Sequence, residues 1–512
     1  MLTNMNVQHK TIAKNTLFLY IGMIVVIGVG LYTVRAILDL LGVVDYGIYN
    51  VVGGVVAMFS FINGTLTSAS QRYFSIELAK GNLKKLNQWF CLHITTFLLL
   101  ILLFLLIAET IGLWFVNTQM TIPSERLVAA NVVYQLSIIS FCIAFFSIPY
   151  NALIIAHEKM RTFAYISIVE ALLKLVIVYI LTIIPWDKLI IYSILMLLVS
   201  CGITIAYIIY DRKHFPESKF YLYWNKTEIR ELFGFTGWHF FGTFSMVIRS
   251  QGINILINMF FNPVINAARA IAFQVYNAVS QLSGNFFTAV KPEIYKLYAN
   301  GEYEALYKLI LRSTIISALL ISILAFPLLG NTAYVLGLWL KEVPEHSVIF
   351  TQLVLINGLI DAINGPIIAS ALATGKIRKY QQIVATLIFL NLPISYLALK
   401  MGTVPQMTVI ISIFISIITT VVRVYLLRSM IGFPIGKYFC LLFRLLIVSI
   451  FILSIIYLTM YNIAINIVML LIISVIILML TVIVYMIFIF DRSDAKTVVR
   501  YIKSRIIFST KL

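Results

Sequence analysis

The sequence predicts an all-α integral membrane protein of about fourteen transmembrane helices, arranged as two parallel six-helix lobes plus two C-terminal helices. Three observations predict this fold. The 512 residues are 61% hydrophobic and 11% charged, with a mean hydropathy of +0.99, whereas a soluble chain carries roughly 25% charged residues. The apolar residues form runs long enough to cross a bilayer, which takes roughly 20 helical residues. One sequence pattern also occurs twice.

The apolar runs predict helices, because a strand can cross a membrane only as part of a closed barrel. They lie near residues 15–34, 44–68, 89–116, 127–155, 162–184, 188–210, 231–257, 264–288, 306–329, 347–371, 380–399, 404–427, 438–460 and 464–489. Grouping these runs gives an N-terminal lobe, a cytoplasmic linker, a C-terminal lobe, two additional helices and a basic tail, at residues 1–210, 211–230, 231–428, 429–490 and 491–512.

The repeated pattern is P-x2-A-x3-A-x2-K-x-R. It begins at Pro149 and again at Pro366, which is 217 residues later (366 − 149). A weaker pair, ending in Gly81 and Gly301, is separated by 220 residues (301 − 81). Two nearly equal spacings over much of the chain indicate a duplicated half.

The basic residues predict the orientation. The net charge is +18, and the charges lie in short clusters between the apolar runs, which is typical of membrane topology and argues against nucleic-acid binding. Most clusters fall on one side, and the exceptions are Arg35, Arg126, Lys188, Lys341 and Lys400. The positive-inside rule therefore predicts cytoplasmic termini. An even number of helices in each half makes the halves parallel repeats. The tail is either an amphipathic basic helix on the anionic inner leaflet or a solvated segment.

Arginines inside the spans point to an anion. Arg249 lies in the seventh span, Arg269 lies in the eighth, and Arg35 ends the first. A charge at mid-bilayer costs at least about 2.5–3.5 kcal/mol, and guanidinium is well suited to bidentate binding of phosphate. We therefore predict an anion site formed by Arg249, Arg269, Arg35 and Lys174. We also expect polar side chains to line its cavity, namely Asn254, Asn258, Tyr276, Asn357 and Asn364. The alternative is that the arginines pair with Asp39, Asp45 or backbone carbonyls.

Two carboxylates in the spans are candidate sites for a coupling ion, either H⁺ or Na⁺. Asp361 shares one face of the tenth span with Asn357 and Asn364, and an isolated intramembrane aspartate is a candidate proton or cation site. The alternative is that Asp361 pairs with Arg249 or with another helix. Glu170 precedes Lys174 by four residues in the fifth span, so the alternative for both is a self-neutralised pair.

The sequence contains no constellation typical of an enzyme. The six histidines are scattered, and the four cysteines lie in or beside apolar runs without a CxxC motif. These cysteines are expected to be reduced packing residues. We therefore predict no catalytic residues, no cofactor and no metal site.

One stretch resembles a known family. Arg35 to Tyr49, with Leu41-Gly42 and Tyr46-Gly47, is similar to the R-x(n)-LG-x(2,3)-YG-x-Y segment of bacterial polysaccharide flippases. Gln71-Arg72-Tyr-Phe resembles the next conserved segment of that family. The resemblance covers essentially the whole chain, and it implies a flippase of the multidrug/oligosaccharidyl-lipid/polysaccharide (MOP) superfamily.

The resemblance implies a multi-pass protein of the bacterial inner membrane. Such a protein would move undecaprenyl-pyrophosphate-linked oligosaccharide, such as an O-antigen unit, to the outer leaflet by alternating access. Its expected partners are the lipid-linked oligosaccharide, membrane lipids and other polysaccharide-assembly proteins. A peptidoglycan lipid-precursor flippase and a cation-coupled multidrug exporter remain alternatives. The exporter is disfavoured because the first, second, seventh and eighth spans have no carboxylate in their interiors. A membrane glycosyltransferase would need a larger external loop.

Overall fold

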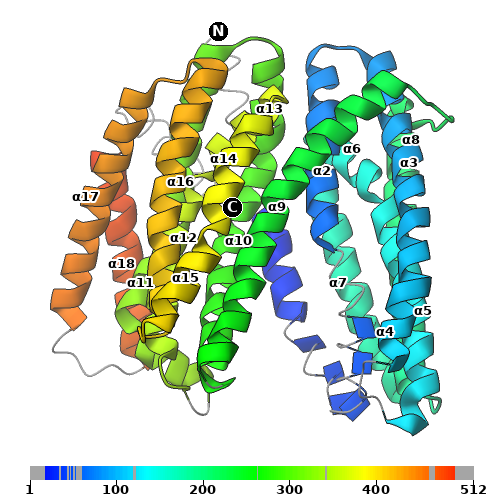
Figure 1. Ribbon diagram of the computed structural model, residues 1–512, viewed down its shortest axis with the longest axis horizontal. Helices are drawn as coiled ribbons and strands as arrows, with labels where there is room; N and C mark the ends of the chain where they lie inside the picture. The colour runs from blue at the N-terminus through cyan, green and yellow to red at the C-terminus, as the bar shows by residue number, and fades with distance from the viewer. Residues whose placement is uncertain are drawn as a thin grey trace, which may run out of the picture. The chain divides into compact units, whose positions relative to one another are not determined.

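The computed structural model describes residues 18–30, 32–33, 36–37, 39–42, 45, 48–49, 52–53, 60–118, 123–261, 263–340, 343–460 and 467–489. These residues are almost entirely helical and contain no β-strand (Figure 1). The prediction of an all-α membrane protein is confirmed. Arg35, most of the segment from Arg35 to Tyr49 that carries the family resemblance, and the tail 491–512 lie outside the described residues.

The chain divides into two compact units. Unit 1 comprises residues 1–243 and 288–301, and unit 2 comprises residues 244–287 and 302–512. The predicted lobes, 1–210 and 231–428, stay a prediction, because the units divide α9 and α10 partway along their length.

Unit 1 contains a helical bundle in which α5 packs along α8 and α2 packs against α6. Its helices are α2 (Ser60–Ala79), α3 (Leu83–Ile107), η1 (Ala108–Gly112), α4 (Leu113–Thr118), η2 (Ser124–Arg126), α5 (Leu127–Phe146), α6 (Ile148–Ala156), α7 (Met160–Ile183), α8 (Lys188–His214) and η3 (Pro216–Ser218). The beginning of α9 (Lys226–Phe260) and the end of α10 (Pro263–Ala299) also belong to this unit.

Unit 2 contains the remaining parts of α9 and α10, together with eight further helices. These are α11 (Tyr303–Trp339), α12 (Ser347–Ala362), α13 (Gly365–Thr374), α14 (Arg378–Phe389), α15 (Asn391–Lys400), α16 (Met407–Ile431), α17 (Ile435–Met460) and α18 (Ile467–Phe488). Helix α11 packs against α12 and α18, and α12 packs against α16 (Figure 1).

Nine described helices are long and apolar enough to cross a membrane, or ten if the bent pair α12 and α13 forms one span. Phe18–Gly30 and Ile472–Phe488 are shorter apolar helices. Helix α10 is not among the ten, because polar residues interrupt its apolar stretches. Helix α2 extends the predicted span 44–68 to Ala79, so Arg72 lies within a helix and is buried.

The two copies of the repeat have the same local geometry. A break at Ser147 separates α5 from α6, and a break at Asn364, 217 residues later (364 − 147), separates α12 from α13. In both copies a proline lies in the first turn of the next helix, where its missing N–H leaves no hydrogen bond unmade. The weaker pair agrees too, because Gly81 and Gly301 both have positive φ, at 67° and 73°.

The linker between α8 and α9 lies against α3. It spans residues 215–225, shorter than the predicted 211–230. The Asn87 side chain of α3 donates to the backbone carbonyls of Glu217 and Lys219, at 2.5 and 2.8 Å. These bonds satisfy carbonyls that a loop would otherwise leave to water.

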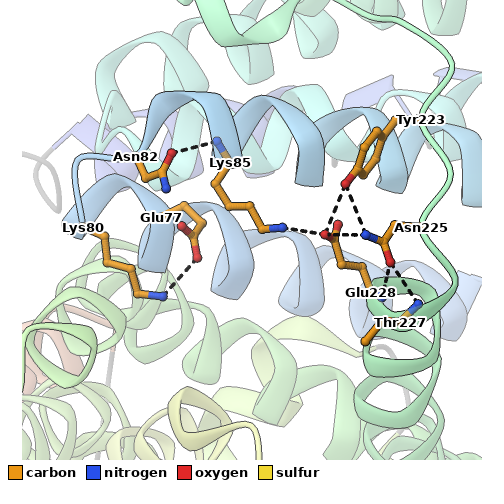
Figure 2. Close-up of polar contacts among 8 residues, drawn as sticks. All are labelled: Glu77, Lys80, Asn82, Lys85, Tyr223, Asn225, Thr227 and Glu228. Carbon is orange, nitrogen blue, oxygen red and sulfur yellow. Dashed lines mark hydrogen bonds and ion pairs between the residues drawn. The ribbon is translucent and has the colours of Figure 1, made fainter.

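A second set of bonds fixes the start of α9. Lys85 Nζ of α3 lies 2.5 Å from Glu228 Oε1 (Figure 2). Tyr223 and Asn225 donate to the same oxygen at 3.2 and 3.1 Å. The side-chain oxygen of Asn225 also accepts from the Thr227 N–H, which is the bonding pattern of a helix N-cap.

Candidate functional site

The candidate site is a group of polar side chains in unit 2, which we call the polar cluster. It is built from the outer part of α9, the adjoining part of α10, and the facing sides of α12 and α16. Its members are Arg249, Gln251, Asn254, Arg269, Tyr276, Asn357, Asp361, Asn364, Ser416 and Thr420.

Helix α10 holds Arg269 because the arginine lies on the buried stripe of that helix. Ile265, Ala268 and Ala272 share the stripe and pack in a hydrophobic cluster with α9, α12 and α16. Arg269 is itself only 4% exposed. Its guanidinium lies over the Phe273 ring, one helical turn further on, with 4.5 Å between the guanidinium carbon and the ring centroid. This contact is a favourable cation–π arrangement.

The Arg269 guanidinium has polar partners but no anionic one. Nη1 donates to Oδ1 of Asn254, and Nη2 lies 3.5 Å from the Ser250 carbonyl oxygen. Nε is buried without a hydrogen-bond partner among the described residues. No described carboxylate forms an ion pair with Arg269. A buried cation without a counter-charge is costly, so this arginine favours an added anion.

Arg249 is the second cation of the cluster and is half-buried. It has no hydrogen-bond or ion-pair partner among the described residues. Its charge acts on both Arg269 and Tyr276, so the two arginines are neighbours, as the sequence predicted. Since Arg249 is the more accessible of the two, an anion would contact Arg249 directly and be attracted by the charge of Arg269 behind it.

Asp361 is held by neutral donors rather than by an arginine. Its Oδ2 accepts from Asn357 at 2.8 Å, and its Oδ1 accepts from Ser416 of α16 at 3.1 Å. The predicted alternative, an Asp361–Arg249 ion pair, does not occur among the described residues. Asn364 lies one turn further along α12 and donates to Thr420 at 2.8 Å. Asp361 therefore has no cationic partner in the described structure.

Tyr276 lies between the cationic and acidic parts of the cluster. The charges of both Asp361 and Arg249 act on it. Its ring packs on Gly358 of α12 so closely that a Cβ there would be 2.5 Å from ring carbon Cε2. The glycine thus allows α10 and α12 to approach at the point where the two charge types meet.

Glu170 and Lys174 are not part of the polar cluster. They lie on α7 in unit 1 and form an ion pair at 2.6 Å, with each side chain 39% exposed. Lys174 has its counter-charge within its own helix, as the self-neutralised alternative proposed. Their assignment to an anion or ion site stays a prediction. The Asn258 side chain and Arg35 lie outside the described residues.

Sequence reasoning missed the partners that other helices supply. Ser416 and Thr420 of α16 approach Asp361 and Asn364 only through tertiary packing. Asp45, proposed as a partner for an arginine of the site, instead binds Arg126, with 2.5 Å between Nη2 and Oδ2. No group of three His, Cys, Asp or Glu side chains in the described part of the chain is arranged to hold a metal ion.

No protein-family model matches the sequence, and no curated protein matches it. Solved structures do match the fold. An outward-facing multidrug resistance MATE family transporter of the MOP superfamily superposes with a TM-score of 0.72 at 13% identity, covering 83% of this chain and 96% of that chain. MATE in the bent conformation gives a TM-score of 0.70 at 13% identity, with the same coverage.

A third similar structure is a MOP superfamily transporter from Pyrococcus furiosus, whose binding pocket of reverse polarity suggests a different function for that protein. It superposes with a TM-score of 0.65 at 13% identity, covering 83% of this chain and 96% of that chain. Agreement at this level over nearly the whole length of these structures shows a common fold. This chain therefore has the fold of the MATE transporters of the MOP superfamily.

Proposed function

We propose that this protein is a flippase that moves a pyrophosphate-linked oligosaccharide lipid from the inner to the outer leaflet by alternating access, for surface polysaccharide synthesis. One observation carries the proposal. Arg249 and Arg269 are neighbouring intramembrane cations, and neither has a carboxylate partner among the described residues. A pyrophosphate supplies the missing negative charge, and its oxygens match the fork of a guanidinium.

The chemistry of the cluster separates head group from sugar. The arginines would bind the pyrophosphate, while the neutral amides around them, such as Gln251 and Asn254, can donate to and accept from sugar hydroxyls. The lipid tail would remain in the bilayer. On this proposal the membrane is a bacterial inner membrane with both termini in the cytoplasm, and other polysaccharide-assembly proteins supply and receive the substrate.

Asp361 is the proposed site of a coupling ion, H⁺ or Na⁺. Its carboxylate accepts hydrogen bonds only from Asn357 and Ser416 in the described structure, so it has no fixed cation. A proton or a sodium ion would neutralise it. Because Asp361 and Arg249 both act on Tyr276, the charge state of the aspartate would be felt at the anion site.

A cation-coupled multidrug exporter is the second candidate. The same unpaired Asp361 favours it, because a carboxylate without a fixed cation can bind a cationic drug. The similarity to a multidrug resistance MATE transporter is consistent with it. The two candidates differ in which charge of the polar cluster faces the substrate.

The experiment uses the purified protein in liposomes with three fluorescent substrates. They are a polyprenyl-pyrophosphate oligosaccharide, a pyrophosphate-linked peptidoglycan precursor and a cationic dye. The proposal expects translocation of the first, and loss of that activity in Arg249→Ala but not in the control Arg428→Ala, an exposed arginine at the end of α16. Translocation of the precursor alone would favour the peptidoglycan flippase. Transport of only the dye would reject a flippase and support the exporter.

A further inference from the structure

A second unusual carboxyl lies outside the polar cluster, where α8 meets the linker to α9. Asp211 is in the last turn of α8 and is fully buried, with 0% of its surface exposed. Both of its carboxylate oxygens are buried without a hydrogen-bond partner among the described residues. Ser218 of the linker is also buried, and its hydroxyl has no partner among the same residues.

An ionised Asp211 would be poorly stabilised here. Removing a carboxylate from water without a donor or counter-ion costs several kcal/mol. The position adds to that cost, because the C-terminal end of a helix carries partial negative charge. A protonated carboxyl avoids both penalties, since it has no net charge.

The titratable and charged groups around Asp211 do not replace a counter-ion. Glu217 of η3 acts on Asp211 with like charge. The other groups nearby are Tyr150 of α6, Tyr207 and Arg212 of α8, His157 after α6, and Cys91 of α3. Tyr207 is already bonded to Asn151, and the Arg212 side chain is exposed to the surroundings of the helix end.

Glu217 is held in its charged form by a different neighbour. Its Oε1 lies 2.6 Å from Nε2 of His157, whose ring stacks on Phe215. Burial acts to raise the pKa of Glu217, but the bond from His157 outweighs it, so the pKa is lower than usual. The buried pair of carboxyls therefore has one stable charge, on Glu217, and repels a second.

We propose that Asp211 is a proton-binding site that controls docking of the 215–225 linker on α3. With the proton bound, Asp211 and Glu217 carry one negative charge and the linker stays docked. Loss of the proton places a second charge beside Glu217, and the linker separates from α3 to admit water. The ligand is a proton because a metal cation would need more oxygen ligands than the Asp211 and Ser218 side chains supply.

The chain contains its own reporter of docking. The Cys91 thiol of α3 lies 3.4 Å from the Lys219 carbonyl oxygen and 3.4 Å from the Tyr221 backbone nitrogen, so the docked linker covers it. When the linker separates, Cys91 becomes open to alkylation. The site is independent of which substrate the transporter moves, so it can be tested whether or not the proposed function holds.

The test uses the full-length protein in lipid nanodiscs, with the other three cysteines replaced. The rate of Cys91 alkylation is measured from pH 6 to 9 in this protein and in its Asp211→Asn variant, which is permanently neutral. Thiolate formation and His157 titration affect both proteins equally. The ratio of the two rates should therefore rise with pH, by at most about tenfold per pH unit for one proton. A ratio that stays constant would overturn the proposal.

Infrared difference spectroscopy provides a readout that does not depend on docking. The protein should show a protonated carboxyl band at neutral pH that is lost in Asp211→Asn and retained in Glu217→Gln. If Asp211→Asn fails to fold, the same band in the unsubstituted protein must still disappear as Cys91 becomes reactive. Absence of the band at neutral pH, or its persistence after Cys91 has become reactive, would contradict the assignment.

Discussion

Glu158 and Lys296 form an ion pair that joins the turn between α6 and α7 to the last turn of α10. Glu158 has a φ of 59°, in the left-handed region that favours glycine. The equivalent residue of the second copy, 217 positions later (375 − 158), is Gly375 with a φ of 72°. A glutamate in this conformation costs roughly 1–2 kcal/mol, and the ion pair offsets that cost.

We therefore expect a measurable coupling between these two residues. A double-mutant cycle of Glu158→Gln and Lys296→Met, followed by thermal unfolding in detergent, should give a coupling energy of about 1 kcal/mol, because both side chains are partly buried. Glu158→Gly should be less damaging than Glu158→Ala, since glycine relieves the backbone strain. Independent, additive effects of the two substitutions would show that the ion pair contributes nothing to stability.

The close approach of α10 and α12 should tolerate no added methyl group. Gly358→Ala places a carbon against the Tyr276 ring, and such overpacking typically costs about 1–3 kcal/mol. The same substitution at Gly337 of α11 is the matched control, because a Cβ there meets nothing within 4 Å. We expect a lower melting temperature and reduced transport for Gly358→Ala only. Equal behaviour of the two variants would mean that the approach is not constrained.

The ion pair of Asp187 predicts a pH-dependent stability. The hydrogen bond from Arg126 lowers the pKa of Asp187 below its ordinary value of 3.8. A depressed folded-state pKa means that the stabilisation is present above the unfolded pKa and is lost as the pH falls through the folded pKa. Asp187→Asn keeps the cap of α8 but removes the charge. Its melting temperature should therefore lie furthest below that of the unsubstituted protein near pH 7.

The gap in melting temperature should shrink below about pH 4, where the carboxyl becomes protonated. Glu345→Gln is the control, because that side chain is 80% exposed. A gap that does not change with pH would show that the charge of Asp187 is not stabilising.

The sequence predicted the helices more completely than the site. Hydrophobic runs located almost every described helix, because long apolar segments have few alternatives in a membrane. The boundary of α2 was wrong, since its continuation carries Gln71 and Arg72. These polar side chains are buried by contacts such as that of Arg72 with Phe235, which no local pattern shows.

Within the site, the stripe of Arg269 could be predicted from helical spacing, and so could the pairing of Glu170 with Lys174. Residues contributed by a distant helix could not. Ser416 reaches Asp361 because α16 packs on α12. Asp211 has no signal in the sequence, because a carboxylate beside Arg212 and Lys213 is typical of a solvated helix end until its burial is known.

Asp361 provides a test of ion coupling. If its carboxylate carries the proton or sodium ion, Asp361→Asn should abolish driven transport while leaving expression and membrane insertion intact. The proposed role also predicts that Asp361→Glu retains partial activity with a shifted pH or sodium dependence. The measurement is ion-gradient-driven translocation in liposomes, with Glu345→Gln as the control. Full activity of Asp361→Asn would remove this residue from the mechanism.

The anion site is tested most directly by the appearance of lipid-linked sugar in the outer leaflet of cells lacking their own flippase. Arg249 and Arg269 supply uncompensated charge, and lysine keeps the charge but loses the guanidinium fork. We predict that Arg269→Lys is impaired, that Arg269→Ala and Arg249→Ala are inactive, and that the control Arg428→Ala is normal, with all four inserted in the membrane. Normal flipping by both alanine variants at the site would contradict the anion-site proposal and leave these arginines with a structural role only.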